Sequence, residues 1–206
     1  LIPSIELARI SGLSWVPATC ISSCEEVRSV LLLARVPPDR IETLAVDLNS
    51  RTSVALARLI LARRYGSHPR MEPMPPEPDS MLRRHDAALL IGDPALRASV
   101  DAQRTALGPG GSPATRVLDL AREWHEMTRM PFVFALWACR PVVRVEEMTA
   151  LLDRSLEEGL AHIDDIASEE AARTGVPAEV ISSYLRHNIS YRLGPAEADS
   201  LRLFYR

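Results

Sequence analysis

Short apolar runs alternate with stretches of helical periodicity along the whole chain. The apolar runs predict β-strands at residues 16–22, 27–35, 43–47, 70–74, 86–91 and 131–138. The helical stretches cover residues 53–65, 79–84, 117–127, 146–166, 168–174, 178–188 and 195–205. Strands that alternate with helices indicate an α/β fold. The first two strands follow each other closely and are expected to pair as neighbours.

Prolines indicate where the chain crosses between two lobes. Pro37 and Pro38 stop the second predicted strand in an extended exit, and Pro131 opens the last predicted strand. These crossings predict a two-lobed protein with a ligand cleft between the lobes. The first lobe would contain residues 1–37 and 132–206, and the second lobe residues 38–131.

The sharpest local signal lies at the start of the helix predicted at residues 53–65. Hydroxyl groups and backbone N–H groups gather there at a helix N-terminus, where the helix dipole favours an anion. The residues are Ser50, Arg51, Thr52 and Ser53. A carboxylate would suit this position. The alternative is that Ser50 or Thr52 only caps the helix, as happens at most helix starts.

Gly92 and Asp93 are a second candidate, because they follow the strongly apolar run at residues 86–91. Ligands of open α/β sheets bind at the carboxyl ends of the strands. Gly92 would allow close approach of a ligand, and Asp93 would accept a hydroxyl proton or cap the following turn. Ser4 would either point its hydroxyl into the cleft or cap a helix that begins near Ile5. Residues 104–115 predict a surface loop without a role.

Charge and composition narrow the classes of partner. The formal net charge is −3, and the basic residues are scattered without a run or an aromatic cluster, so no nucleic-acid partner is expected. The histidines and the three cysteines, Cys20, Cys24 and Cys139, lack metal-ligand spacing, so no metal site is predicted. No apolar stretch reaches the roughly 18 residues of a membrane span. We therefore expect a cytoplasmic protein that does not span a membrane.

Six segments taken together resemble one known family. They are Leu1-Ile2-Pro3-Ser4-Ile5-Glu6, Val27-Arg28-Ser29-Val30-Leu31-Leu32, Ser50-Arg51-Thr52-Ser53-Val54-Ala55-Leu56, Ala87-Ala88-Leu89-Leu90-Ile91-Gly92-Asp93, Pro131-Phe132-Val133-Phe134-Ala135-Leu136-Trp137 and Leu201-Arg202-Leu203-Phe204-Tyr205. In this order they are similar to the chorismate dehydratase family of the futalosine route to menaquinone. The resemblance covers essentially the whole chain.

The resemblance implies a type II periplasmic-binding-protein-like fold and a lyase without metal or organic cofactor. Its substrate would be chorismate, which loses water to give 3-[(1-carboxyvinyl)oxy]benzoate. Because this reaction forms a benzene ring, the enzyme mainly has to hold a dianion with the departing hydroxyl and ring proton in place. In this family the enolpyruvyl carboxylate of the substrate is thought to take the ring proton.

The resemblance also suggests a role for each candidate residue. The residues from Ser50 to Ser53 would hold a substrate carboxylate or shape its pocket. Gly92 and Asp93 would line the second lobe, and Ser4 would face them from the first lobe.

The front of the chain departs from the family pattern. Family members begin with a β-α segment that carries a Ser-Tyr-Leu-Asn stretch, whose Asn lies in the active site, and this chain starts downstream of it. We therefore expect an N-terminally truncated sequence. Two alternative functions stay open: 1,4-dihydroxy-6-naphthoate synthase of the same pathway, which relies on a histidine base, and a non-catalytic solute-binding protein for a small organic anion.

Overall fold

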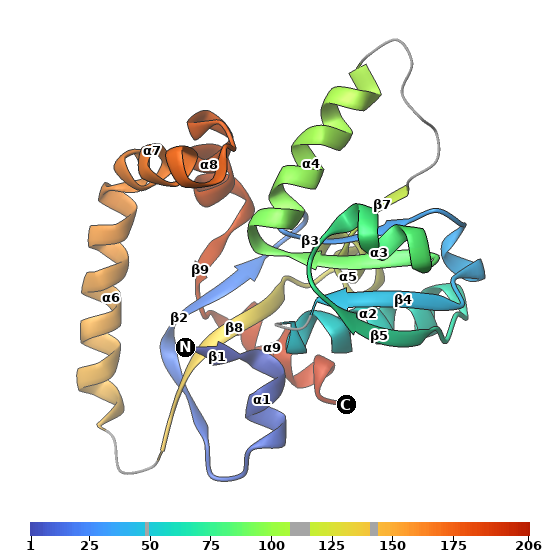
Figure 1. Cartoon of the computed structure of the whole chain (residues 1–206). Coiled ribbons are helices and arrows are strands. Elements are labelled where there is room, and N and C mark those ends of the chain that lie inside the picture. The colour runs from blue at the N-terminus through green and yellow to red at the C-terminus, as the bar shows by residue number, and fades with distance from the viewer. Residues whose placement is uncertain (48–49, 108–115, 141–143) are drawn as a thin grey trace. The chain divides into compact units, whose positions relative to one another are not determined.

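Two compact units make up the chain in the computed structural model, which describes residues 1–47, 50–107, 116–140 and 144–206 (Figure 1). Unit 1 combines Leu1–Glu25 with Thr128–Arg206, and unit 2 is the continuous stretch Glu26–Met127. The chain therefore enters unit 2 at Glu26 and leaves it after Met127.

Unit 2 is built around a five-stranded sheet in the order β5-β4-β6-β3-β7. Its strands are β3 (Val30–Ala34), β4 (Thr43–Asp47), β5 (Arg70–Met74), β6 (Ala87–Ile91) and β7 (Arg116–Asp119). β4 is parallel to both β5 and β6, whereas β3 is antiparallel to β6 and β7. Every residue of β3 is buried, as expected of a strand with neighbours on both sides and helices on both faces.

Helices cover both faces of this sheet (Figure 1). They are α2 (Arg51–Tyr65), α3 (Pro78–Arg84), α4 (Gly92–Leu107) and α5 (Leu120–Thr128), with a short 3₁₀ turn, η1, at Pro38–Arg40. One face packs against α3 and α4 through a buried apolar cluster: Leu31, Leu33, Ala45, Met74, Met81, Ala88, Leu90 and Ala95. Leu32, Leu44 and Leu89 alternate with these positions and point to the opposite face, which α2 covers.

Unit 1 contains a four-stranded antiparallel sheet in the order β1-β8-β2-β9. Its strands are β1 (Ile2–Pro3), β2 (Ser14–Ser23), β8 (Phe132–Cys139) and β9 (Ser190–Arg192). Its helices are α1 (Ser4–Arg9), α6 (Val145–Ala161), α7 (Ile163–Thr174), α8 (Ala178–Ser183) and α9 (Pro195–Phe204), with a π-helical turn, η2, at Tyr184–Asn188. Strands from both ends of the sequence therefore share one sheet.

The two ends of the chain pack on each other within unit 1. The Tyr205 hydroxyl donates to the Ser4 carbonyl at 2.6 Å. The rings of Phe132 and Phe204 meet edge to face, with centroids 4.9 Å apart. Cys20 and Leu136 belong to a buried apolar cluster of this unit, and Tyr205 packs against it.

The pairing expected between the first two predicted strands is wrong. β2 pairs with β8 and β9 in unit 1, whereas β3 pairs with β6 and β7 in unit 2. Residues 30–34 thus lie in the sheet of unit 2, although residues 1–37 were placed in the first lobe. The physical reason is that an apolar strand is accepted by whichever sheet buries both of its faces, and sequence proximity does not choose between two sheets.

Three further segments differ from expectation. Residues 92–107 form α4, although residues 104–107 were expected to belong to a surface loop. Residues 116–119 form β7, and the helix expected to begin at residue 117 begins at Leu120. The predicted helix at 146–166 is divided at His162 into α6 and α7. The rest of the expected loop, residues 108–115, lies outside the described residues.

Among the described residues, no helix is both long enough and apolar enough to cross a membrane.

Candidate functional site

Helices α2, α4 and α5 of unit 2 follow strands that end at one edge of its sheet. β4 and β6 are parallel, and β6 and β7 are each antiparallel to β3, so β4, β6 and β7 run in the same direction. Their carboxyl ends lead into α2, α4 and α5 in turn. The N-terminus of a helix carries partial positive charge, so this carboxyl edge favours an anion.

Ser50 occupies the N-cap position of α2 at this edge. It is only 6% exposed, and its backbone N–H donates to the Asp47 carbonyl at 3.1 Å. Its hydroxyl does not cap the helix, and no described residue hydrogen-bonds the buried Oγ. A buried polar group normally has a partner, so this hydroxyl is suited to a ligand.

The next residues of α2 differ in exposure. Arg51 is exposed, whereas Thr52 and Ser53 are buried in the first turn of the helix. Asp47, the last residue of β4, is buried beside them. The structure therefore brings the predicted residues together at one helix N-terminus. Of the polar turn at residues 47–53 that the sequence singled out, Leu48 and Asn49 lie outside the described residues.

Gly92 begins α4 directly at the end of β6. Its φ angle is +63°, in the left-handed region that glycine adopts without steric cost. Its N–H donates to the Ser29 carbonyl at 2.8 Å, which ties the start of α4 to the segment before β3. Asp93 is partly exposed in the first turn of α4. Both predicted residues thus lie at the carboxyl edge.

Asp119 is a residue at this edge that the sequence did not reveal. It ends β7 and is 6% exposed. Its Oδ1 accepts the N–H groups of Ala121 and Arg122 at 3.0 and 3.2 Å, which caps α5. Its carboxylate also accepts the N–H groups of Val27 and Arg28 at 3.1 and 2.6 Å.

Burial has an electrostatic consequence at Asp119. Loss of contact with water raises the pKa of its carboxyl above the usual value, although the amide hydrogen bonds oppose this effect. Asp119 was not predicted as a site residue because residues 117–127 were expected to form one helix. A signal was available, since an Asp directly before a helical stretch is a preferred N-cap residue.

Ser4 has a structural contact in unit 1. Its side chain is fully buried, and its hydroxyl donates to the Val133 carbonyl at 2.7 Å. It opens α1 and does not cap it, because the N-cap position is Pro3. The hydroxyl therefore ties α1 to β8, and the role of Ser4 toward a ligand stays a prediction.

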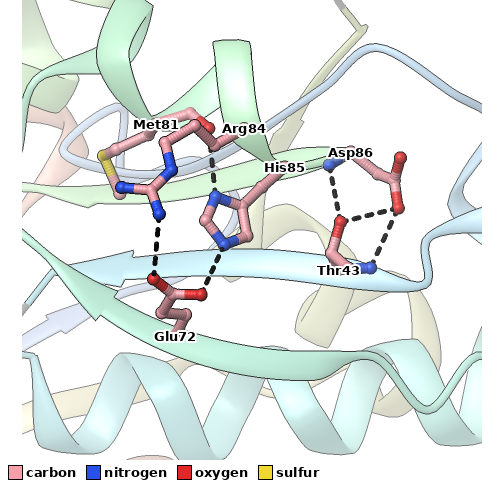
Figure 2. A network of polar contacts seen from close by, with 6 residues as sticks. All are labelled: Thr43, Glu72, Met81, Arg84, His85 and Asp86. Carbon is pink, nitrogen blue, oxygen red and sulfur yellow. Dashed lines mark hydrogen bonds and ion pairs between the residues drawn. The ribbon is translucent and has the colours of Figure 1, made fainter.

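A polar network lies at the opposite edge of the same sheet, the amino edge, where β4 and β6 begin. Figure 2 shows its residues. The His85 side chain is 3% exposed, and its Nδ1 and Nε2 atoms lie 3.3 Å from the Met81 carbonyl and from the Glu72 carboxylate. Arg84 also approaches Glu72, at 3.9 Å. The ring of His85 therefore joins α3 to β5.

Asp86 holds the start of β4 in this network (Figure 2). Its Oδ2 accepts the Thr43 hydroxyl at 2.8 Å and the Thr43 N–H at 2.9 Å. The N–H of Glu42 donates to the same oxygen at 3.1 Å. Partial burial by itself would raise the pKa of Asp86, but these hydrogen bonds and the nearby Arg35 lower it below the usual value.

Other candidates for chemistry are dispersed. Within the described part of the chain, no three His, Cys, Asp or Glu side chains are grouped so that they could hold a metal ion. Cys20 and Cys139 are buried thiols, and Cys24 is exposed. Burial raises the pKa of Cys20 to about 11, so its thiol stays protonated at neutral pH. His125 lies on α5, and its buried Nδ1 makes no hydrogen bond with a described residue.

Sequence comparison identifies the family. The family described as menaquinone biosynthesis matches residues 1–206, which is the whole chain. The chain belongs to this family. It is 31% identical over 202 residues to the chorismate dehydratase of Thermus thermophilus. That alignment covers 94% of this chain and 72% of the Thermus protein.

Solved structures show the same fold at low sequence identity. A crystal structure of a protein from Archaeoglobus fulgidus matches with a TM-score of 0.66 and 17% identity, covering 99% of this chain and 75% of that one. The periplasmic aliphatic sulphonate binding protein of Escherichia coli matches with a TM-score of 0.54 and 14% identity, covering 98% and 65%. The menaquinone biosynthesis chain is thus an α/β protein of the periplasmic-binding-protein type, as expected.

Proposed function

We propose that this protein is a chorismate dehydratase, a carbon–oxygen lyase that converts chorismate to 3-[(1-carboxyvinyl)oxy]benzoate and water. The observation that carries this proposal is the 31% identity to the Thermus chorismate dehydratase over 94% of the chain. The match of the menaquinone biosynthesis family to residues 1–206 supports the same assignment. A biosynthetic enzyme of this kind acts in the cytoplasm.

The proposed reaction needs no side chain of the protein as a base. A ring C–H bond breaks, and its electron pair forms the last double bond of the benzene ring as the neighbouring C–O bond breaks. The proton moves to the enolpyruvyl carboxylate of the substrate, which passes it to the departing hydroxyl group so that water leaves. Because aromatisation favours the product, the protein mainly has to hold the dianion with the breaking bonds aligned.

The carboxyl edge of unit 2 fits a carboxylate of this substrate. The Ser50 hydroxyl would donate to the carboxylate, and the first turn of α2, with Arg51, Thr52 and Ser53, would provide the positive end of the helix dipole. Gly92 and Asp93, at the start of α4, would border the ligand at the end of β6. These roles are assigned from the Ser50 hydroxyl, which has no hydrogen-bond partner among the described residues, and from the direction of the strands.

A product assay tests the proposal directly. We would express the whole reading frame that encodes this chain, incubate the purified protein with chorismate and follow the mixture by chromatography with mass detection. Loss of one water from chorismate, at a rate proportional to protein concentration, is the expected result. A heat-inactivated sample measures spontaneous decay of chorismate. Binding without turnover would favour a solute-binding protein, and failure to bind would overturn the assignment.

A further inference from the structure

Arg28, just before β3, has an unusual backbone conformation. Its φ angle is +60°, and among the described non-glycine residues only Arg28 and Arg129 have positive φ. The left-handed region brings Cβ close to the following carbonyl oxygen, which disfavours it for every residue except glycine and, to a lesser degree, Asn and Asp. An arginine in this conformation has to be held there by its surroundings.

The Asp119 carboxylate fixes this conformation by accepting hydrogen bonds from the backbone. Its Oδ2 accepts the Arg28 N–H at 2.6 Å, while its Oδ1 accepts the Val27 N–H at 3.1 Å. The same Oδ1 caps α5 through Ala121 and Arg122, so the carboxylate is fixed to a helix. The left-handed turn at Arg28 thus rests on a carboxylate that has a rigid support.

The turn at Arg28 determines where the next backbone group lies. Ser29 follows, and its carbonyl accepts the Gly92 N–H at 2.8 Å at the start of α4. The Arg28 guanidinium also donates to the Ser99 hydroxyl of α4 at 3.2 Å. A connected path of hydrogen bonds therefore runs from Asp119 through residues 28–29 to the beginning of α4.

We propose that Asp119 is a positioning residue for the ligand site at this edge: it holds Arg28 in the left-handed conformation, and this turn sets the backbone at Gly92. The ligand part of the proposal rests on the proposed function. In this proposal Asp119 does not contact the substrate; besides capping α5, it affects the site through the backbone of residues 27–29. Its loss should therefore weaken ligand binding more than it slows the bound substrate.

Two substitutions of Arg28 form a matched pair. Arg28→Gly and Arg28→Val both remove the guanidinium and its bond to Ser99, but only valine is penalised at a φ of +60°. For Arg28→Val we expect a KM for chorismate at least about tenfold higher with little change in kcat, and for Arg28→Gly a KM within about twofold of wild type. Equal effects of the two substitutions would overturn the proposal, because they would assign the role to the guanidinium.

Asp119→Asn tests the carboxylate itself. The amide group of Asn would place N–H donors against backbone N–H groups, so the turn should relax and KM should rise as in Arg28→Val. In the double variant Asp119→Asn with Arg28→Gly, glycine adopts the turn without the carboxylate, and we expect most of the affinity to return. An unrescued double variant, with a thermal transition like that of Asp119→Asn, would show that Asp119 does not act through this turn.

A readout without ligand separates this proposal from the proposed function. Hydrogen exchange at the Gly92 amide, which donates to Ser29, should be at least about tenfold faster in Arg28→Val than in Arg28→Gly. This comparison holds even if wild type ignores chorismate, in which case the proposed function fails and the positioning role is judged by exchange alone. Unchanged Gly92 exchange in folded Arg28→Val would overturn the positioning role. If Asp119→Asn does not fold, the comparison of Arg28→Val with Arg28→Gly still tests the positioning role.

Discussion

At the scale of single residues, the two edges of the sheet in unit 2 are built differently. At the amino edge Oδ2 of Asp86 and the Thr43 hydroxyl are hydrogen-bonded to each other and to backbone N–H groups. At the carboxyl edge the Ser50 hydroxyl is buried and has no hydrogen-bond partner among the described residues. A satisfied network stabilises a fold, whereas an unsatisfied buried donor is a cost that a ligand can remove.

Ser50→Ala tests this difference. Because the hydroxyl makes no described hydrogen bond, its removal should leave the thermal transition within about one degree of wild type. Chorismate affinity should fall about tenfold, the loss expected for one hydrogen bond to a charged group. Calorimetric titration measures the affinity. Ser168→Ala, which removes an exposed hydroxyl bonded to the Asp164 carbonyl, is the matched control and should bind normally. Unchanged affinity in Ser50→Ala would remove Ser50 from the proposed site.

Asp86→Asn tests the amino edge through pH. The pKa of Asp86 is lowered in the folded protein, so its charge stabilises the fold at pH values above the unfolded pKa and loses this effect as pH falls through the folded pKa. At pH 7 we expect Asp86→Asn to lower the free energy of unfolding by about 1 kcal/mol. The difference from wild type should shrink as the pH falls below 3.8, the ordinary value. Urea unfolding at several pH values measures it, and a difference that stays constant with pH would contradict the assignment to ionised Asp86.

At the scale of elements, β3 determines how unit 2 is assembled. It lies between β6 and β7, and its register pairs Leu32 with Leu89 on one side and with Leu118 on the other. All five of its residues are buried. A strand that contacts two neighbours and both helical layers contributes to every part of the core, so its side chains should be the least tolerant of truncation.

Leu32→Ala is the corresponding prediction. Leu32 is fully buried, so the substitution should lower the free energy of unfolding by about 3 kcal/mol through lost burial and the cavity left behind. Leu151→Ala is the matched control, because Leu151 is 50% exposed on α6 and its truncation should cost less than about 0.5 kcal/mol. Chemical denaturation compares the two variants. Similar losses in both would contradict the placement of Leu32 in the core.

At the scale of the whole molecule, the two units use the chain in different ways. Unit 2 is continuous in sequence, with its own sheet and apolar core. Unit 1 needs both ends of the chain, because β1 and β2 flank β8. Only the continuous unit has all of its sheet contacts within one stretch of sequence, so it is the unit that can fold alone.

Fragments of the chain test this conclusion. We expect residues 26–127 to unfold cooperatively when heated, because the fragment retains all five strands of the sheet. A fragment of residues 38–131, the second lobe expected from the prolines, lacks β3 and should remain unfolded or aggregate, since β6 and β7 would lose the strand between them. Circular dichroism during heating distinguishes the two. A cooperative transition in the shorter fragment would show that β3 is dispensable.

Much of the local structure could be predicted from sequence because its causes are local. The periodicity of α2, its N-terminal Ser50 and the apolar run that became β6 are properties of neighbouring residues. Gly66 ends α2 with a φ of +66°, a conformation that only glycine adopts at low cost. The family resemblance also followed from sequence alone, because it depends on the order of segments. The match over residues 1–206 confirms it.

Other features depended on contacts between distant segments. The choice of sheet for β3 was decided by partners about 57 and 85 residues further along the chain. The hydrogen bonds from the Val27 and Arg28 N–H groups to Asp119 join residues 92 and 91 positions apart in the sequence, so no local pattern could predict them. The sequence alone determined which segments are strands and helices and which family they form, because those properties are local or ordered along the chain. Only the tertiary structure decided which segments meet, because burial rewards contacts without regard to sequence distance.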